Sequence, residues 1–354
     1  MSITKWHEQA EVDDSVIISS RIRLARNLTA FPFPSRISSA GAASAIETIR
    51  GAAFGKTDAS DATDATDAIG YALTFCDLSQ LPTEQLRELC EKRVISFAMV
   101  NKAIVRGLIY NDEENISILL NEEDHLRIQA IAPGHDLDAA YEIAVSLDDT
   151  ISQGLEYAFD AEFGYLTSCP TNTGTGLRAS YMLHLPLLEN TGSIKAYADV
   201  ITKAGFAIRG THGEGTEPMG AIYQISNQIT LGKTEAETLS ALKHLANQIV
   251  DKELALRERV IKEFLHETED AVFRAYGILT NCRKIGLDEA MRLLSEIRLG
   301  NILGLLKHKP LDSTIYNLMI NILPYTLQRT MGKVATDTRM LDVLRADYLR
   351  KSIQ

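Results

Sequence analysis

The sequence predicts an α+β fold in two parts, a region built on an antiparallel sheet and a helical region at the carboxy terminus. Short β-rich runs separated by polar turns occur at 103–110, 115–124, 126–132, 178–188, 206–210 and 220–230. Closely spaced runs of this kind are typical of antiparallel strands rather than of alternating βαβ units. After Thr234, leucine, isoleucine and valine recur at spacings of three and four, the period of a helix. We therefore expect the sheet within residues 1–250 and a helical domain in 251–354.

Length and composition agree with two folded units. The chain has 354 residues, which exceeds the length that a single hydrophobic core usually supports. Its 45% hydrophobic and 23% charged residues are ordinary values for a globular protein. The sequence has neither an apolar run of membrane-spanning length nor the residue order of a signal peptide, so we predict a cytoplasmic protein with no membrane partner. The net charge of −11 argues against direct nucleic-acid binding. Four scattered cysteines predict neither a zinc site nor a disulfide framework.

The remaining elements follow from local patterns. The first strand is expected at 16–28, where alternation places Arg21 and Arg23 on the same face. The repeated Asp-Ala-Ser/Thr of 55–70 predicts a solvated surface insertion without a chemical role. Helical spacing of apolar residues predicts helices at 83–98, 136–161 and 193–204.

Arginines in unusual contexts are the first candidates for function. They are Arg21 and Arg23 in SSRIR, Arg127 in NEEDHLR, Arg178 in CPTNTGTGLRAS and Arg209 in RGTHGEGTE. A single arginine is usually a solvated surface residue, but these mark several strand ends and loops, where functional groups are commonly held. Guanidinium forks bind phosphate oxygens in pairs, so the cluster could bind a triphosphate without a P-loop. The GKT at 232–234 is no P-loop, because Asn227 stands where that motif needs glycine.

Two polar segments accompany the arginines. Glu122, Glu123 and Asp124 are consecutive carboxylates just before Arg127. Charge alone favours a solvated turn there, but the neighbouring arginine raises the weight of a functional role. The glycine-rich segment 209–216 is equally consistent with a flexible loop and with a lid that closes over phosphates.

In this order, SSRIRLARN, NEEDHLRI, SCPTNTGTGLRAS and RGTHGEGTE resemble the signature segments of the ATP:guanidino phosphotransferases, the creatine and arginine kinase superfamily. The resemblance spans about residues 15–250. Small-molecule kinases of this superfamily carry an additional helical domain before the SSR segment, which here begins at Ser19. The helical extension at the carboxy terminus is similar to that of the bacterial protein-arginine kinases. The resemblance implies a glutamine synthetase-like catalytic domain, an antiparallel sheet flanked by helices, and phosphorylation of arginine side chains on proteins.

The resemblance also implies roles for individual residues. Glu123 would orient the acceptor guanidinium and take its proton, and Glu214 would be a second carboxylate contact. Cys169 would contact the guanidinium as a thiolate, although an ordinary buried thiol is an equal alternative. The expected cofactors are ATP and Mg²⁺, with the metal held by phosphates and water rather than by protein ligands. The implied nucleotide-binding set is Arg21, Arg23, Arg127, Arg178, Arg209, Ser20 and His212.

The chain departs from the family pattern at two places. Met182 stands where phosphagen kinases have a histidine near the adenine. The Arg-Asp-x-x-Arg-Ala motif that senses phosphoarginine in protein-arginine kinases here begins with Leu341, so only Asp342 and Arg345 remain for an allosteric site.

Partners and alternatives follow from the same resemblance. It implies arginine-containing protein substrates, such as basic repressors and unfolded proteins, in a stress response that marks proteins for Clp-type degradation. An activator protein of the McsA type, a Clp chaperone-protease and a homodimer are further expectations. The alternatives are a phosphagen-type kinase acting on a free guanidino metabolite and a noncatalytic adaptor that binds phosphoarginine. The early position of the SSR segment argues against the first alternative, and the intact Glu123 and arginines argue against the second.

Overall fold

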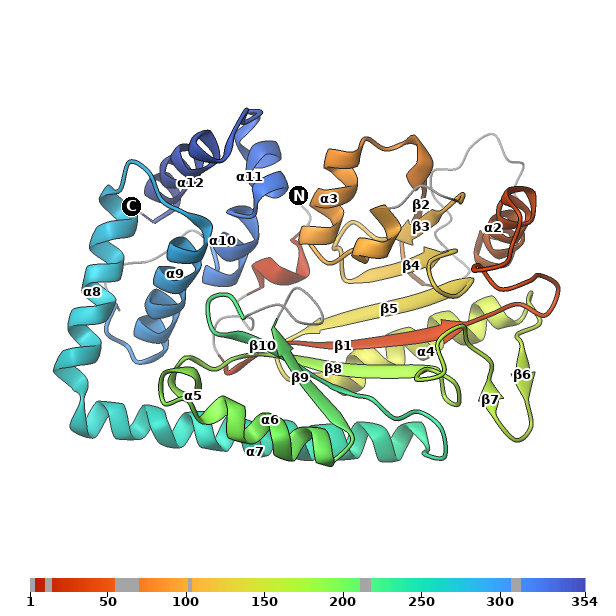
Figure 1. Ribbon diagram of the computed structural model, residues 1–354, viewed down its shortest axis with the longest axis horizontal. Helices are drawn as coiled ribbons and strands as arrows, with labels where there is room; N and C mark the ends of the chain where they lie inside the picture. The colour runs from red at the N-terminus through yellow and green to blue at the C-terminus, as the bar shows by residue number, and fades with distance from the viewer. Residues whose placement is uncertain are drawn as a thin grey trace.

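The computed structural model describes residues 4–9, 15–54, 70–100, 104–210, 218–306 and 313–353. At its centre is an eight-stranded antiparallel sheet with the strand order β2-β3-β4-β5-β1-β8-β10-β9 (Figure 1). In that order the strands are Thr74–Asp77, Gly107–Tyr110, Ile116–Leu120, Leu126–Pro133, Ile17–Arg26, Leu177–His184, Ile222–Asn227 and Phe206–Gly210. A separate hairpin is formed by β6 (Phe159–Asp160) and β7 (Gly164–Tyr165).

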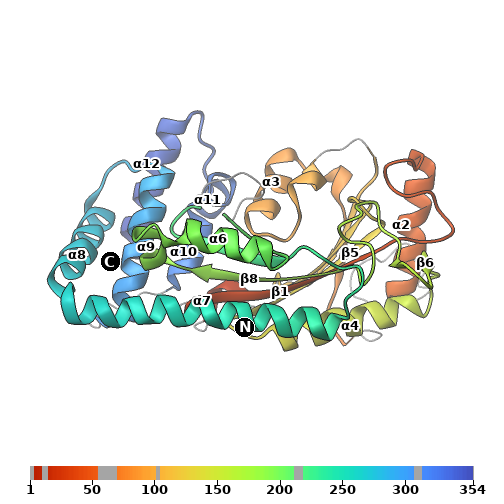
Figure 2. The same ribbon diagram turned by 60° about the horizontal axis from the view of Figure 1, so that its bottom comes forward.

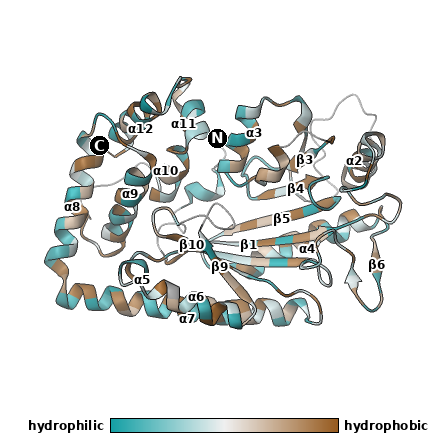
Figure 3. Ribbon diagram, in the orientation of Figure 1, coloured by the Kyte–Doolittle hydropathy of each residue, from teal (hydrophilic) through white to brown (hydrophobic). Residues whose placement is uncertain are grey.

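One face of the sheet is apolar and covered by helices. Side chains that alternate along the strands, such as Ile22 and Leu24 of β1, are buried in the main core with residues of α4 (Leu137–Ser152) and α7 (Glu235–Glu263). Figure 2 shows both helices beneath the sheet. The helices α2 (Ser39–Phe54) and α6 (Ser193–Lys203) contribute to the same core. Because strand residues alternate between faces, the polar residues between these positions point to the opposite side. The strands accordingly carry both hydrophobic and hydrophilic residues along their length (Figure 3).

The carboxy-terminal region is helical and has its own core. Its helices are α8 (Leu265–Asn281), α9 (Leu287–Ile302), α10 (Ile315–Asn321), α11 (Pro324–Met331) and α12 (Thr338–Ser352). This second core also includes Trp6 of the 3₁₀ helix η1 (Trp6–Glu8), Ile131 of β5 and Met182 of β8. The carboxy-terminal helices therefore pack against the polar side of the sheet at one end. The long helix α7 runs through the expected boundary near residue 250.

Smaller elements lie above the polar face. The helix α3 (Thr83–Glu91) is followed by the 3₁₀ helix η3 (Phe97–Val100), and η2 (Leu78–Gln80) precedes it. Figure 2 shows α3 on the side of the sheet opposite to α4 and α7. The short α5 (Pro186–Asn190) follows β8 directly and, unlike these, contributes Leu188 to the main core.

The structure confirms the α+β class, with an antiparallel sheet flanked by helices and a helical carboxy-terminal region. Several predicted elements extended past the observed ends of the helix or strand. The helix expected at 83–98 ends at Glu91, because Arg93 takes the left-handed conformation with φ 64°. The strand expected at 178–188 ends at His184, since Pro186 begins α5. The helix expected at 136–161 ends at Ser152.

Several elements were not predicted, and most of one predicted segment is not described. The helix α2 and the edge strand β2 were missed. Most of the Asp-Ala-Ser/Thr repeat, residues 55–69, lies outside the described residues. Within the described ranges, none of the helices has the length and apolar character needed to cross a membrane.

Candidate active site

The polar face of the sheet carries the predicted arginines in register. Arg23 of β1 pairs with Arg178 of β8 on one side and with Gln129 of β5 on the other. Paired residues of antiparallel strands project to the same face, so these side chains form a row across three strands. On the neighbouring strands, Arg209 of β9 pairs with Gln224 of β10. The prediction that Arg21 and Arg23 share a face is confirmed, because both line one cavity.

That cavity, which we call the arginine pocket, has a volume of about 420 Å³. All five predicted arginines line it: Arg21, Arg23, Arg127, Arg178 and Arg209. Its other wall comes from α3 and the residues after it, including Arg87, Arg93 and Phe97, and from Tyr325 of α11. The pocket is therefore bounded by the sheet, by α3 and by the carboxy-terminal helices.

The electrostatics of the arginine pocket favour an anion. Burial, together with the positive charges of Arg93, Arg127 and Arg178, lowers the pKa of Arg21 to about 9. Burial and neighbouring arginines lower the pKa of Arg23 well below its usual value. Among the residues that the structure describes, the buried Nε of Arg23 has no hydrogen-bond partner. Crowded, desolvated guanidinium groups are stabilised when a polyanion supplies the missing charge and acceptors.

A second, smaller cavity of about 70 Å³ adjoins one end of the arginine pocket and shares Arg23, Arg127 and Arg178 with it. We call it the acceptor pocket. Glu123 and Cys169 both line it. The Sγ of Cys169 lies 3.1 Å from Oγ1 of Thr171, which lines the same cavity. The structure thus places a carboxylate and a thiol beside three of the predicted arginines.

The two consecutive glutamates have different surroundings. Glu122 is buried, and one of its carboxylate oxygens accepts a hydrogen bond from Nη1 of Arg127 at 2.6 Å. Glu123 is more exposed and accepts from Nη2 of the same arginine at 3.3 Å. Partial burial, followed by the charges of Asp124 and Glu122, raises the pKa of Glu123, although Arg127 acts against this shift. Glu122 therefore holds Arg127, whereas Glu123 faces the acceptor pocket with a carboxylate that binds a proton more readily than usual.

The turn that carries these glutamates is fixed by its other residues. Asn121 has a left-handed backbone, and its Nδ2 donates to the carbonyls of Ala42 and Val105. Asp124 is buried, and its Oδ1 accepts from Nδ2 of Asn27 and from the backbone N of Ser168, both at 2.7 Å. The contact to Ser168 joins the turn of Glu123 to the loop of Cys169.

The histidine that ends this turn is also structural. Nδ1 of His125 accepts from the backbone N of Leu28 at 3.1 Å, and its Nε2 lies 3.2 Å from the carbonyl of Pro32. Burial lowers the pKa of His125, which favours the neutral ring. These contacts orient the loop and leave His125 outside the chemistry of the site.

The glycine-rich loop before β8 is clamped from below by Arg26. The guanidinium of Arg26 binds Oδ2 of Asp148 through Nε and Nη2, and its Nη1 donates to the carbonyls of Ala25 and Thr175. Gly176 has φ +65°, and a Cβ there would lie 2.5 Å from Nη1 of Arg26. Position 176, two residues before Arg178, therefore requires glycine, because its φ is positive and because a Cβ would collide with Arg26.

Ser20, Asp342 and Arg345 do not line either pocket. The hydroxyl of Ser20 donates to the carbonyl of Gly134 and accepts from the backbone N of Asp136, which caps α4, so it does not join the arginine cluster. Arg345 of α12 is buried and donates to the carbonyls of Ile322 and Ile285 and to Oδ1 of Asp342. These contacts hold the carboxy-terminal helices together. Glu214 and His212 lie outside the described residues.

Among the polar residues that line the arginine pocket and that sequence reasoning missed are Arg87, Arg93, Gln224 and Tyr325. The sequence signal for Gln224 is a polar residue within an otherwise apolar part of a strand. Its Oε1 accepts a hydrogen bond from Nη2 of Arg21 at 2.9 Å. The other three come from α3, from the turn after it and from α11. No local pattern marks them, because only the tertiary fold brings these helices over the sheet.

Family models match both parts of the chain. Residues 56–256 match the ATP:guanido phosphotransferase C-terminal catalytic domain, and residues 266–354 match the protein-arginine kinase McsB C-terminal domain.

Curated relatives match nearly the full length. A protein-arginine kinase of Desulforamulus reducens is 41% identical over 350 residues, which is 99% of this chain and 95% of the relative. A protein-arginine kinase of Geobacillus kaustophilus is 42% identical over 356 residues, covering 100% of this chain and 94% of the relative.

Solved structures share the fold of most of the chain. A lombricine kinase superposes with a TM-score of 0.57 and 26% identity, over 72% of this chain and 69% of that chain. A duplicated taurocyamine kinase from Schistosoma mansoni, with bound transition-state analogue components, gives a TM-score of 0.58 and 27% identity, over 69% of this chain and 34% of that chain.

Proposed function

The chain belongs to the ATP:guanido phosphotransferase family, among its protein-arginine kinases, and phosphorylates arginine side chains of proteins; from this premise we propose which of its residues perform the transfer. The observation that carries the assignment is the junction of the two cavities. The arginine pocket and the acceptor pocket share Arg23, Arg127 and Arg178. A phosphoryl group in transit must lie between nucleotide and acceptor, and the shared lining supports these three arginines as the groups that would bind it there.

We propose that the arginine pocket binds the triphosphate of ATP. The lowered pKa of Arg21 and the unpartnered Nε of Arg23 fit a site that is completed by phosphate oxygens. Phosphoryl transfer relies mainly on positioning and on stabilising the charge of the equatorial oxygens. Arg23, Arg127 and Arg178 would bind the transferring group, while Arg21, Arg93 and Arg209 would bind the nucleotide behind it.

Glu123 would be the base. An arginine is protonated at neutral pH, so its nitrogen has no lone pair for attack until a proton leaves. The Glu123 carboxylate would accept that proton as the guanidino nitrogen bonds to the γ-phosphorus and the bond to the β-phosphate oxygen breaks. The raised pKa of Glu123 suits this task, because a base is most effective when its pKa approaches the working pH.

The other proposed contacts complete the acceptor pocket. Cys169 lines it and would face the guanidinium beside Glu123. On the basis of the family motif, Glu214 would be a second carboxylate contact to the guanidinium, and His212 would contact the nucleotide. When bound, Mg²⁺ would be held by phosphate oxygens and water, and it would neutralise part of the negative charge of the phosphates.

Wider roles rest on family membership. We propose basic repressors and unfolded proteins as substrates, in the cytoplasm, within a stress response that marks proteins for Clp-type degradation. An activator of the McsA type, a Clp chaperone-protease, a homodimer and an allosteric role of Asp342 and Arg345 belong to the same proposal. So does the division into a catalytic domain of 1–250 and a helical domain of 251–354.

The test is incubation with ATP, Mg²⁺ and an arginine-rich protein, followed by phosphosite mapping under nonacidic conditions, because nitrogen-linked phosphate is labile in acid. We expect phosphoarginine on the protein and weak or absent transfer to free arginine or creatine. The matched control is the Glu123→Gln variant under the same conditions. Efficient turnover of a free guanidino metabolite, with no phosphoarginine on protein, would contradict the proposed substrate.

A further inference from the structure

A tyrosine of the carboxy-terminal helices reaches the polar face of the sheet. Tyr316 of α10 is 2% exposed, and its hydroxyl donates to Sδ of Met182 on β8 at 3.0 Å. The same hydroxyl is a hydrogen-bond partner of the Arg93 side chain. Its ring packs against Trp6 with a centroid distance of 5.8 Å. The hydroxyl therefore links the carboxy-terminal region to an arginine of the arginine pocket.

Arg93 is held from two sides. Its backbone is left-handed, and its carbonyl accepts from Nε2 of Gln129 on β5 at 2.9 Å. This contact fixes the main chain above the sheet, but the side chain needs a separate support. Arg93 and Arg21 line the same pocket, and their positive charges repel each other. The hydroxyl oxygen of Tyr316 is an acceptor for Arg93, which offsets that repulsion and keeps its guanidinium in place.

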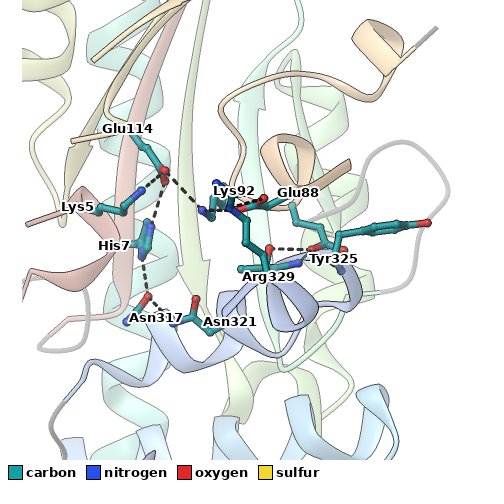
Figure 4. A network of polar contacts seen from close by, with 11 residues as sticks. Lys5, His7, Glu88, Lys92, Glu114, Asn317, Asn321, Tyr325 and Arg329 are labelled. Carbon is teal, nitrogen blue, oxygen red and sulfur yellow. Dashed lines mark hydrogen bonds and ion pairs between the residues drawn. The ribbon is translucent and has the colours of Figure 1, made fainter. Parts of the chain in front are cut away.

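Tyr316, the residue that supports Arg93, is itself held in place through its neighbour Asn317 on α10. Asn317, the neighbour of Tyr316, accepts through Oδ1 from Nδ2 of Asn321 at 3.1 Å and lies 2.9 Å from Nδ1 of His7. Figure 4 shows this network continuing from His7 through Glu114 to Lys92, the residue before Arg93. The helix α10 and the turn of Arg93 are thus tied to each other by two routes.

Arg93 lies away from the reacting end of the site. It lines the arginine pocket and a small cavity of about 10 Å³ with Arg21 and Met182, but it is not among the residues of the acceptor pocket. A group that contacts only the part of a substrate that does not react contributes equally to the ground state and the transition state. Its loss should raise KM and leave kcat nearly unchanged.

We infer that Tyr316 is a positioning residue for nucleotide binding, through which the carboxy-terminal helical region holds Arg93 against the phosphates of ATP. The inference rests on the proposed function of the arginine pocket. It makes the helical region part of the nucleotide site, in addition to any role in regulation or in contacts with other proteins.

The first test is Tyr316→Phe in the full chain, which removes the hydroxyl and keeps the ring against Trp6. The Kd of MgADP, measured by calorimetry well below the melting midpoint, should rise about threefold to tenfold, which corresponds to roughly the net contribution of one ordinary hydrogen bond. The KM for ATP should rise in parallel, with kcat and the KM for an arginine-rich protein nearly unchanged. Tyr276→Phe is the matched control, because its hydroxyl contacts the carbonyl of Ile353 in the same helical region.

A double-mutant cycle shows whether Tyr316 acts through Arg93. Arg93→Met should weaken MgADP binding at least as much as Tyr316→Phe, and the double variant should bind no more weakly than Arg93→Met alone. Additive losses, or a Kd of Tyr316→Phe equal to that of the wild type, overturn the inference while leaving the proposed function intact. A wild-type chain that does not bind MgADP overturns both.

Discussion

Within the turn 121–125, neighbouring carboxylates do different work. Glu122 is buried and paired with Arg127 at 2.6 Å, while Glu123 lies 3.3 Å from the same arginine and lines the acceptor pocket with Cys169. Asp124 points the other way and joins this turn to the loop of Cys169 through Ser168. A run of like charges is thus divided by geometry into a support for an arginine, a candidate base and a structural link.

We predict that Glu123→Gln keeps the fold and most of the MgADP affinity but lowers transfer about a hundredfold to ten-thousandfold, because the amide cannot accept the proton. The measurement is kcat for phosphoarginine formation beside calorimetric binding of MgADP. The exposed Glu84→Gln on α3 is the matched control and should behave as wild type. A variant within a few-fold of wild-type kcat would remove Glu123 from the role of base.

The pH dependence follows from the same carboxylate. Burial raises the pKa of Glu123, so its proton-accepting form is lost at a higher pH than for an ordinary glutamate. The rate should therefore fall as pH decreases through this raised pKa, and kcat/KM against pH should show an acid limb with a midpoint above about 4.3. The limb should be absent from the residual activity of Glu123→Gln. A midpoint at or below the ordinary value would contradict the assignment.

Arg178 lines both the arginine pocket and the acceptor pocket, so its loss should affect the transferring group. Arg178→Lys keeps the charge but not the two-pronged fork, and we expect kcat to fall by about a hundredfold. The control is Arg259→Lys, an exposed arginine of α7. Steady-state kinetics with saturating arginine-rich protein measure the effect, and near-normal turnover would count against the arginine cradle.

At the scale of the elements, the loop before β8 requires glycine at position 176 both for its positive φ and for the close approach of Arg26. Gly176 and Gly192 have nearly the same φ, +65° and +68°. Beside Gly176 a Cβ would meet the guanidinium of Arg26 and the carbonyl of Ala25, whereas beside Gly192 it would meet nothing within 4 Å. The pair therefore separates the cost of a left-handed backbone from the cost of lost space.

We predict that Gly176→Ala lowers the free energy of unfolding by about 3 kcal/mol or more and displaces Arg178, with a large loss of activity. Gly192→Ala should cost only about 1 kcal/mol, the strain of a left-handed alanine, and should keep normal kinetics. Denaturant unfolding and the transfer assay provide both measurements. Equal destabilisation of the two variants would show that the clamp of Arg26 does not constrain the loop.

At the scale of the whole molecule, one face of the sheet forms the main core and the other lines the candidate active site. One face is buried against α4 and α7, while the other presents arginines to a cavity that α3 and the carboxy-terminal helices close. The net charge of −11 surrounds this positively charged pocket with a negatively charged protein. Such a surface attracts basic partners and repels acidic ones.

We therefore predict that kcat/KM for a basic protein substrate, at saturating ATP, falls about tenfold as ionic strength rises from about 0.05 M to about 0.5 M. A short peptide with one arginine and no net charge is the control and should show a much smaller change. If both substrates respond equally, the salt effect belongs to the nucleotide or to the reaction itself rather than to attraction of the protein.

The sequence by itself determined the α+β class, the family and the five arginines that line one pocket. Each of these depends on local information, since strand alternation places Arg21 and Arg23 on one face and four ordered motifs identify the superfamily. The same local rules misjudged the end of the helix at Glu91, because a left-handed Arg93 is stabilised by contacts distant in sequence, such as that with Gln129.

Only the tertiary structure decided which residues share the site beyond those motifs. Arg93 and Tyr325 enter the arginine pocket because α3 and α11 are placed over the sheet, and Tyr316 reaches Arg93 from more than two hundred positions along the chain. Ser20, one residue from Arg21, is engaged instead by the carbonyl of Gly134 and the backbone N of Asp136, both more than a hundred positions along the chain. Long-range packing leaves no periodic signal in a single sequence, so such partners become visible only when the chain is folded.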